Sequence, residues 1–289
     1  MKVSYYPGCS LDGTAREYKE SLEAVAAALD IELEELRDWT CCGSSSAHVK
    51  NDTLAVSLAA RNLMIADKTG LDLMVPCAAC YLRLKVAEKE LKAGKQIDGV
   101  PGKYNGNFHI KHSADFLWEQ TGEKALRDRV KKPLEGLNLV CYYGCLTTRP
   151  PKVTGASIPE DPQSMDNLMG NLGAGVINWS YKTDCCGGSL ILSHPDIART
   201  LIKKLLDMAI EAGADAIVAG CPMCQSNLDT RQKELPADAG GKYAMPVFYF
   251  TELMGLAFGI PSAEKWLNHH LTDAKSLLRQ KGLLQGKPA

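Results

Sequence analysis

Cysteines are the residues of this sequence whose type and spacing could do chemistry. Two doublets, each followed by a glycine, stand out: Cys41-Cys42-Gly43 and Cys185-Cys186-Gly187. Neighbouring side chains on a strand point to opposite faces, so a doublet aimed at one place needs a sharp bend, which the glycine would ease. A single cysteine precedes each doublet and a C-x-x-C follows it. The first set is Cys9, Cys41, Cys42, Cys77 and Cys80, and the second set is Cys145, Cys185, Cys186, Cys221 and Cys224.

The two sets repeat the same spacing. The distance from doublet to C-x-x-C is 36 positions in both, from 41 to 77 and from 185 to 221. An internal repeat of this kind predicts two equivalent metal sites. The sequence has 11 cysteines, so Cys141 is left over. It aligns with Tyr5 rather than with a motif cysteine, and we expect no ligand role for it.

Three kinds of thiol site could explain the sets. A structural zinc needs four ligands, so five cysteines would leave a spare thiol. A thioredoxin-like C-x-x-C would leave the doublets unexplained. An ordinary iron–sulfur cubane also uses four cysteines, and five indicate a larger or unusual cluster. The spacing favours iron–sulfur, while zinc and thiol chemistry stay open.

Composition narrows the class of protein and its location. The chain has 289 residues, 45% of them hydrophobic, and a net charge of -1, which favours a globular protein without a nucleic-acid footprint. The start, Met1–Pro7, lacks the apolar run of a signal peptide, and no stretch approaches the roughly 18 apolar residues of a spanning helix. We therefore expect a cytoplasmic protein without a membrane span. In a reducing cytoplasm, clustered cysteines are metal or redox groups more often than disulfides.

Strands alternating with helices predict an α/β fold of two pseudo-symmetric repeats, each a small, mainly parallel sheet flanked by helices. We expect domains at 1–136 and 137–289, the second with a C-terminal helix over 263–280 as a cap. Each cysteine group then follows a strand, and loops after parallel strands meet at one sheet edge. The expected strands are 2–7, 31–39, 71–75, 108–112, 137–143, 175–180, 215–219 and 246–250, and the expected helices are 14–29, 53–68, 80–92, 113–121, 163–173 and 196–212.

The motifs resemble a known family. The stretches Trp39-Thr40-Cys41-Cys42-Gly43, Pro76-Cys77-Ala78-Ala79-Cys80, Thr183-Asp184-Cys185-Cys186-Gly187 and Gly220-Cys221-Pro222-Met223-Cys224 resemble the tandem cysteine-rich CCG domain. The stretches Tyr6-Pro7-Gly8-Cys9 and Tyr142-Tyr143-Gly144-Cys145 fit its lead cysteines. The length and order of the motifs are similar to the B subunit of heterodisulfide reductase. The resemblance covers nearly the whole chain and is more specific for the domain than for the substrate.

This resemblance implies a cofactor and an activity. In that family each five-cysteine set holds a noncubane [4Fe-4S] cluster, which would make all ten cysteines ligands. The disulfide of coenzyme M and coenzyme B is cleaved between the two clusters, so the resemblance implies the catalytic subunit of a disulfide oxidoreductase of methanogenesis. The chain has no C-x-x-C-x-x-C-x-x-x-C-P segment. We therefore expect electrons to arrive through two partners, the ferredoxin-like C subunit and the flavin-containing A subunit of the complex.

Two alternatives to this function remain. One is a CCG-domain electron-transfer subunit for another substrate, such as a sulfur compound or a hydroxy acid. The other is a zinc-stabilised scaffold within a redox complex. Among other residues, His48 and His194 follow the doublets, but we favour surface or core positions over ligation, and we expect His112 to be packed at a strand end. Arg149 and Lys152 could hold an anionic substrate group, although a solvated loop is favoured.

Overall fold

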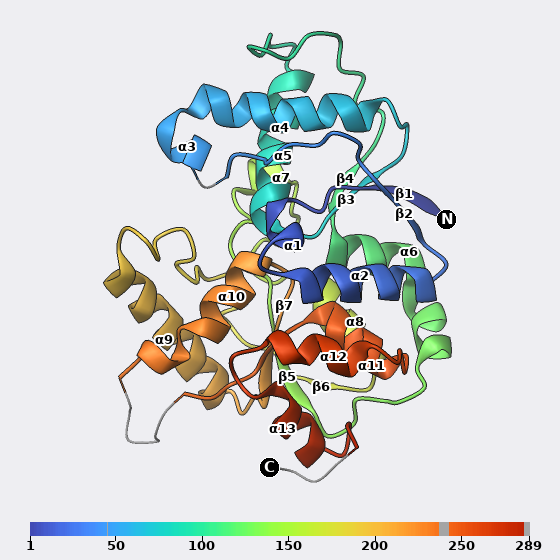
Figure 1. Cartoon of the computed structure of the whole chain (residues 1–289), viewed down its shortest axis with the longest axis vertical. Coiled ribbons are helices and arrows are strands. Elements are labelled where there is room, and N and C mark those ends of the chain that lie inside the picture. The colour runs from blue at the N-terminus through green and yellow to red at the C-terminus, as the bar shows by residue number, and fades with distance from the viewer. Residues whose placement is uncertain (45, 237–242, 286–289) are drawn as a thin grey trace.

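Two four-stranded sheets form the framework of the molecule (Figure 1), and the computed structural model describes residues 1–44, 46–236 and 243–285. The strand order is β2-β1-β3-β4 in one sheet and β6-β5-β7-β8 in the other, and every pairing is parallel. Counted within its half, each sheet has the same order, which confirms the predicted α/β fold of two similar halves. The strands are β1 Lys2–Tyr5, β2 Glu32–Glu35, β3 Leu73–Val75, β4 Ile110–His112, β5 Asn138–Tyr142, β6 Gly175–Val176, β7 Ala216–Ala219 and β8 Val247–Tyr249.

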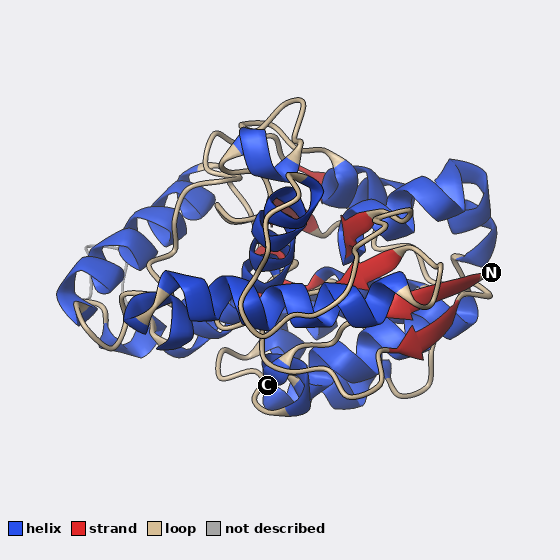
Figure 2. Ribbon diagram, turned by 90° about the horizontal axis from the view of Figure 1, so that it is seen from above, coloured by secondary structure: helices blue, strands red, loops and turns tan. Residues whose placement is uncertain are grey.

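Helices cover both faces of the two sheets (Figure 2), so the central strands carry continuous apolar runs. Leu-Met-Val of β3 and Ala-Ile-Val-Ala of β7 are buried throughout. The helices bury one stripe each, as Ile202, Leu205 and Ala209 show on α9. The longer helices are α2 Arg16–Ala28, α4 Asp52–Asp67, α5 Ala78–Lys92, α6 Ser113–Arg129, α8 Ser164–Asn171, α9 Pro195–Glu211, α10 Pro222–Thr230 and α11 Phe250–Ala257.

The two halves share a helical layer. Helix α2 of the first half packs on α11 of the second, and α6 packs on α8. Within each half α2 and α8 follow the first strand, while α6 and α11 follow the last. The two contacts are therefore equivalent, as a pseudo-twofold axis requires. One apolar core runs through this layer and draws side chains from both halves.

The structure corrects several of the expected elements, and the strand expected over 31–39 is only Glu32–Glu35. The expected helix over 263–280 is broken into α12 Ala263–Trp266, a 3₁₀ turn at Leu267–His269 and α13 Ala274–Gln280. Asp229 explains the break, because its carboxylate accepts the backbone N–H groups of Leu271 and Thr272 and holds the chain extended between the pieces. The segment still covers the core, with Trp266 buried directly over Gly255. The strand expected over 175–180 is only Gly175–Val176, and the helix expected over 113–121 runs on to Arg129 as α6. Lys152, expected in a solvated loop, lies in the short helix α7 Pro151–Thr154.

Within the residues that the structure describes, no helix is both long enough and apolar enough to cross a membrane.

Candidate metal centre

The cysteines lie just after the carboxyl ends of the strands, as predicted. In the first half Cys9 follows β1 and opens α1 Cys9–Asp12, and Cys77 follows β3 at the start of α5. The second half places Cys221 in the same way, between β7 and α10. Both doublet glycines have a left-handed backbone, with φ of +75° at Gly43 and +74° at Gly187. The sharp bend inferred from the doublets is therefore present in both halves.

A matched pair of tyrosines ties each doublet to the strand of its lead cysteine. The Tyr6 hydroxyl donates to the backbone oxygen of Thr40 at 2.7 Å, and the Tyr142 hydroxyl donates to that of Asp184 at 2.6 Å. Both acceptors directly precede a doublet. Because the tyrosine rings are buried, these bonds fix the doublets against the sheet.

A second matched pair brings the lead segment onto the C-x-x-C. Gly8 and Gly144 precede the lead cysteines and have φ of +73° and +72°. A Cβ on Gly8 would lie 3.0 Å from Cys80 Sγ, and a Cβ on Gly144 would lie 3.0 Å from Cys224 Sγ. The glycines therefore leave the room that each of these sulfurs occupies. Cysteines that are 71 positions apart in the first half (9 to 80) and 79 apart in the second (145 to 224) therefore converge.

Within each set the sulfurs approach one another in pairs. In the first set Cys41 Sγ lies 3.9 Å from Cys9 Sγ, and Cys42 Sγ lies 3.2 Å from Cys80 Sγ. In the second set the thiols of Cys145 and Cys185 interact, and Cys186 Sγ lies 3.6 Å from Cys224 Sγ. Cys77 and Cys221 contact the last cysteine of their own sets.

The two sets also meet each other. The thiols of Cys77 and Cys221 interact across the boundary between the halves, and both are buried. The sulfurs of the two sets thus form one run, with Cys77 and Cys221 at its middle. At the two outer ends of the run Cys9, Cys41 and Cys185 are exposed, so the outer cysteines face solvent while the inner ones are enclosed.

Neighbouring thiols favour a thiolate at the second cysteine of each doublet. Hydrogen bonds from Cys41 and Cys80 lower the pKa of Cys42 to about 4. A hydrogen bond from Cys224 lowers the pKa of Cys186. Thiolates are the form in which cysteine binds metals. The two sets agree at this position, whereas the first cysteine of the doublet has a raised pKa in the first set, where Cys42 hydrogen-bonds to Cys41, and a lowered pKa in the second, where Cys145 hydrogen-bonds to Cys185.

The donor set fits iron–sulfur chemistry better than a single metal ion. The sulfurs lie in pairs spread along the run, and each set holds one thiol more than a tetrahedral zinc uses. An all-thiol set that spans several ångströms suits an iron–sulfur cluster, which is bound by cysteine thiolates.

The other residues considered from the sequence lie outside the run of sulfurs. Cys141 is fully buried in β5 and belongs to the core between the halves, and burial and Asp166 raise its pKa. His48 is exposed and contacts Asp52, and His194 is also exposed. Arg149 pairs with Glu160 and donates to Thr183 at 3.0 Å, so its charge is already partnered, and Lys152 is exposed.

Two residues at the boundary between the halves have a larger role than the sequence indicated. His112 is packed as predicted, 2% exposed, but its ring contacts the C-x-x-C turns of both halves. Tyr18, which the sequence presented only as an apolar helix position, contacts the same two turns. No local pattern marks either residue, because their partners are backbone oxygens 36 to 202 positions away.

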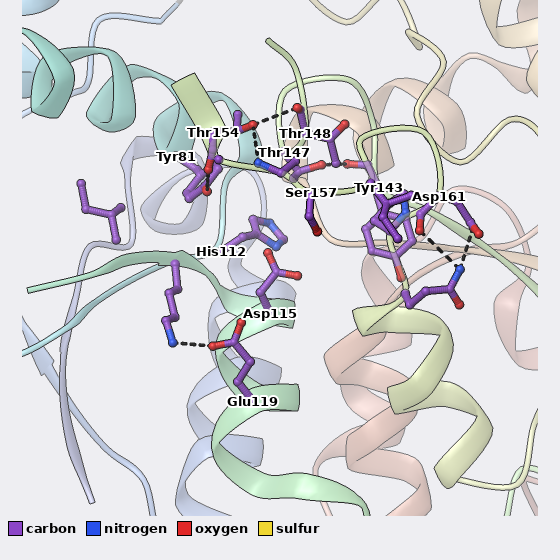
Figure 3. Close-up of a pocket in the computed structure, with 17 residues that line it drawn as sticks. Tyr81, His112, Asp115, Glu119, Tyr143, Thr147, Thr148, Thr154, Ser157 and Asp161 are labelled. Atoms are coloured by element: carbon purple, nitrogen blue, oxygen red, sulfur yellow. Dashed lines mark hydrogen bonds and ion pairs between the residues drawn. The ribbon is translucent and has the colours of Figure 1, made fainter. Parts of the chain in front are cut away.

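A cavity of about 370 Å³ lies beside His112, with side chains from both halves around it (Figure 3). Tyr81, which follows Cys80, lines it from the first half, and Thr147, two residues after Cys145, lines it from the second. The cavity is therefore lined by segments that follow a cysteine of each set. The remaining charged residues of its lining are Lys111, Asp115, Glu119 and Asp161, of which Lys111 pairs with Glu119 and Asp161 with the buried Lys182.

Comparison with known proteins agrees with this geometry. The family model described as CCG, cysteine-rich domain, matches residues 3–85 and 139–229. The chain is 34% identical to the 8-methylmenaquinol:fumarate reductase membrane anchor subunit of Wolinella succinogenes, over 96% of this chain and 99% of that protein. It is 26% identical to the B subunit of the ferredoxin:CoB-CoM heterodisulfide reductase of Methanosarcina mazei, over 89% of each.

Among solved structures, a hypothetical protein from Helicobacter pylori matches with a TM-score of 0.74 and 13% identity. The match covers 95% of this chain and 52% of that one. At this identity the likeness concerns the fold, and it confirms the arrangement of two similar α/β halves.

Proposed function

This chain belongs to the CCG cysteine-rich domain family, and from this premise we propose that it is the iron–sulfur subunit of a redox complex. It is related to the B subunit of heterodisulfide reductase, and we propose that a small-molecule disulfide is reduced in this complex between two noncubane [4Fe-4S] clusters. The ligands would be the ten cysteines of the two sets. The chain would catalyse the reaction and not merely carry electrons.

One observation carries this proposal. Cys77 and Cys221 interact across the pseudo-twofold boundary. The backbone oxygens of Pro76 and Gly220, directly before them, lie 3.2 Å and 3.0 Å from the same His112 Nε2, so the two sets lie next to each other. A relay that passes single electrons has no need of two equivalent centres in contact. A reaction that opens one S–S bond and leaves one sulfur at each centre does need two such centres. The adjacency of the sets therefore supports a two-electron reaction at a paired centre.

The reaction balances with the groups proposed. A disulfide R–S–S–R′ takes up two electrons and two protons, its S–S bond breaks, and two thiols RSH and R′SH leave. Bound clusters would supply the electrons and stabilise thiolates next to iron. The chain's own part is to hold the two sets side by side and to admit the substrate. The cavity beside His112 has the size of a small-molecule site.

The charged residues around that cavity indicate how much negative charge its substrate can carry. Lys111, the cation in its described lining, is paired with Glu119, and Asp115 adds a further carboxylate. Arg149 is paired with Glu160 and is not offered to a ligand. The sulfonate and phosphate of the coenzyme M–coenzyme B disulfide would therefore find little attraction here. We propose a less anionic disulfide as the substrate that this cavity suits.

Partners follow from the use of the cysteines. All of them fall in the two sets apart from the buried Cys141, so the motifs leave none for a cubane relay. We propose that a ferredoxin-like subunit passes electrons to the chain from a flavin-containing subunit. The purified chain should be reduced slowly by a flavin donor alone and faster once the ferredoxin-like subunit is added. Equal rates with and without that subunit would contradict this part.

A second candidate is favoured by the 34% identity to the Wolinella succinogenes protein over almost its whole length. In this case the chain would be the electron-transfer subunit of a quinol:fumarate reductase. A quinol also carries two electrons, so a paired centre would suit it as well. The two candidates share the clusters and differ in the substrate.

Metal and sulfide analysis comes first. The chain purified under anaerobic conditions should contain iron and acid-labile sulfide in equal amounts. Zinc without sulfide would contradict both candidates and support a scaffold. The second measurement gives the reduced complex either a disulfide or fumarate with a menaquinol analogue. Formation of free thiols supports the first candidate. Quinol-dependent fumarate reduction without thiol release would replace it by the second.

A further inference from the structure

Two backbone oxygens at the centre of the molecule are shared by the same pair of side chains. The oxygens belong to Pro76 and Gly220, which directly precede Cys77 and Cys221. His112 Nε2 lies 3.2 Å from the Pro76 oxygen and 3.0 Å from the Gly220 oxygen. The Tyr18 hydroxyl lies 3.3 Å and 3.0 Å from the same two oxygens. Each side chain therefore bridges the two C-x-x-C turns.

The direction of the histidine bonds is fixed by its other nitrogen. The backbone N–H of Ala114 points to His112 Nδ1 at 3.4 Å, which makes Nδ1 an acceptor. The ring proton of a neutral histidine is then on Nε2, and it is shared between the Pro76 and Gly220 oxygens. A carbonyl oxygen can only accept, so the Tyr18 hydroxyl also donates to them. Ser113 Oγ, 3.1 Å from that hydroxyl, can in turn donate to Tyr18.

The surroundings hold both rings in place. A Cβ on Gly220 would lie 2.9 Å from His112 Cε1, so a glycine at this position leaves the room for the histidine ring. Tyr18 stacks on Tyr249 with ring centroids 4.2 Å apart and planes 5° from parallel. His112 and Tyr18 are 2% and 0% exposed. In such a dry site each hydrogen bond is costly to lose, because the freed carbonyl finds no water.

We propose that His112 and Tyr18 are positioning residues that set the separation and relative orientation of the two cysteine sets. Both come from the first half and reach the turn of the second half, so they lock one set against the other. The inference rests on the proposed function, since it assigns the lock to a paired centre that one substrate must reach at both sulfurs. It concerns geometry between the sets and not the binding of metal within either set.

The experiment compares three single variants of the whole chain, purified anaerobically in its complex. Tyr18→Phe and His112→Leu each remove one bridging donor. Tyr249→Phe is the matched control: it removes a hydroxyl from the same aromatic stack, and that hydroxyl has no hydrogen-bond partner among the described residues. A fourth variant, His112→Gln, restores an amide N–H as donor.

Three quantities are measured on each protein: iron and sulfide per chain, the magnetic interaction between the two reduced centres by electron paramagnetic resonance, and the kcat and KM of disulfide reduction. Tyr18→Phe and His112→Leu should retain iron and sulfide but alter the magnetic interaction. Their kcat should fall about 10- to 100-fold with KM nearly unchanged, because a misplacement of about 1 Å is enough for such a loss. Tyr249→Phe should match the wild type, and His112→Gln should recover part of the interaction.

Gly220→Ala tests the same lock without removing a donor, because its Cβ displaces the histidine ring. It should reproduce the altered magnetic interaction of His112→Leu. An interaction unchanged in both Tyr18→Phe and His112→Leu would overturn the inference. So would two reduced centres in the wild type without any interaction, or equal loss of iron in these variants and in Tyr249→Phe. A wild type with interacting clusters but no activity on disulfides would refute the proposed substrate alone and leave the positioning role standing.

Discussion

His270 and Glu252 form a buried ion pair whose loss at high pH should weaken the fold. His270 Nε2 lies 3.0 Å from both carboxylate oxygens of Glu252, and the two side chains are 1% and 0% exposed. Burial disfavours the charged imidazolium, but the charge and hydrogen bond of Glu252 outweigh it and raise the pKa of His270 to about 9. The charges of Asp229 and Glu17 also raise the pKa of His270.

The size and sign of the effect follow from this pKa. The ordinary pKa of the histidine is 6.5, so the difference corresponds to about 3 kcal/mol of unfolding free energy. Between pH 6.5 and about 9 the folded chain holds a proton that the unfolded chain has released. The free energy of unfolding therefore falls by about 1.4 kcal/mol per pH unit across this window. Below pH 6.5 the contribution is complete.

Equilibrium urea unfolding under anaerobic conditions at several pH values between about 6 and 9 measures the slope. His270→Gln removes the titrating ring and should flatten the pH dependence, at the cost of lower stability at the acidic end of this range. His109→Gln is the control, because His109 is exposed and should leave the slope as in the wild type. If the wild type and His270→Gln lose stability in parallel as the pH rises, the ion pair does not carry the effect and the reasoning is wrong.

Three further predictions concern the cysteine sets and the core. Cys42→Ala should remove about half of the iron per chain and Cys141→Ser none; loss of iron in the second variant would show that the spare cysteine has been misassigned. Trp266→Ala should lower the free energy of unfolding by about 3–5 kcal/mol, measured by urea unfolding, because a fully buried indole is lost. Gly187→Ala should lose the iron of the second set, since its Cβ would meet the backbone of α9 at 2.9 Å. Gly213→Ala should keep that iron, because Gly213 lies in open space with a similar φ. Equal iron in the two glycine variants would refute this account.

The repeat of the cysteine spacing was enough to predict two halves and the meeting of each set at a sheet edge. Parallel strands force this result, because their carboxyl ends lie on one side whatever the loops contain. The left-handed backbone at Gly43 and Gly187 was also foreseeable, since a doublet followed by glycine indicates a bend. These features depend on the local sequence and on the order in which strands and helices alternate along the chain, and both can be predicted from one sequence.

Contacts between segments that are far apart in the sequence could not be predicted from the sequence in this way. The helix expected over 263–280 fails because Asp229, more than forty residues away, captures two backbone N–H groups in its middle. The apolar periodicity there remains, but a tertiary hydrogen bond outweighs the local preference. Tyr18 likewise looks like any core tyrosine until the fold brings the Gly220 oxygen to its hydroxyl.

The equivalence of the α2–α11 and α6–α8 contacts has an evolutionary consequence. A protein with a single repeat could build this shared helical layer only by pairing with a second copy of itself, with each contact made twice. In such a homodimer every substitution would appear on both sides of the axis. Fusion of the two copies removes that constraint. In the present chain His112 ends β4 while Tyr249 ends β8, so the two sides of the axis already differ. An unsymmetrical molecule bound across the axis therefore need no longer meet identical surroundings at its two ends.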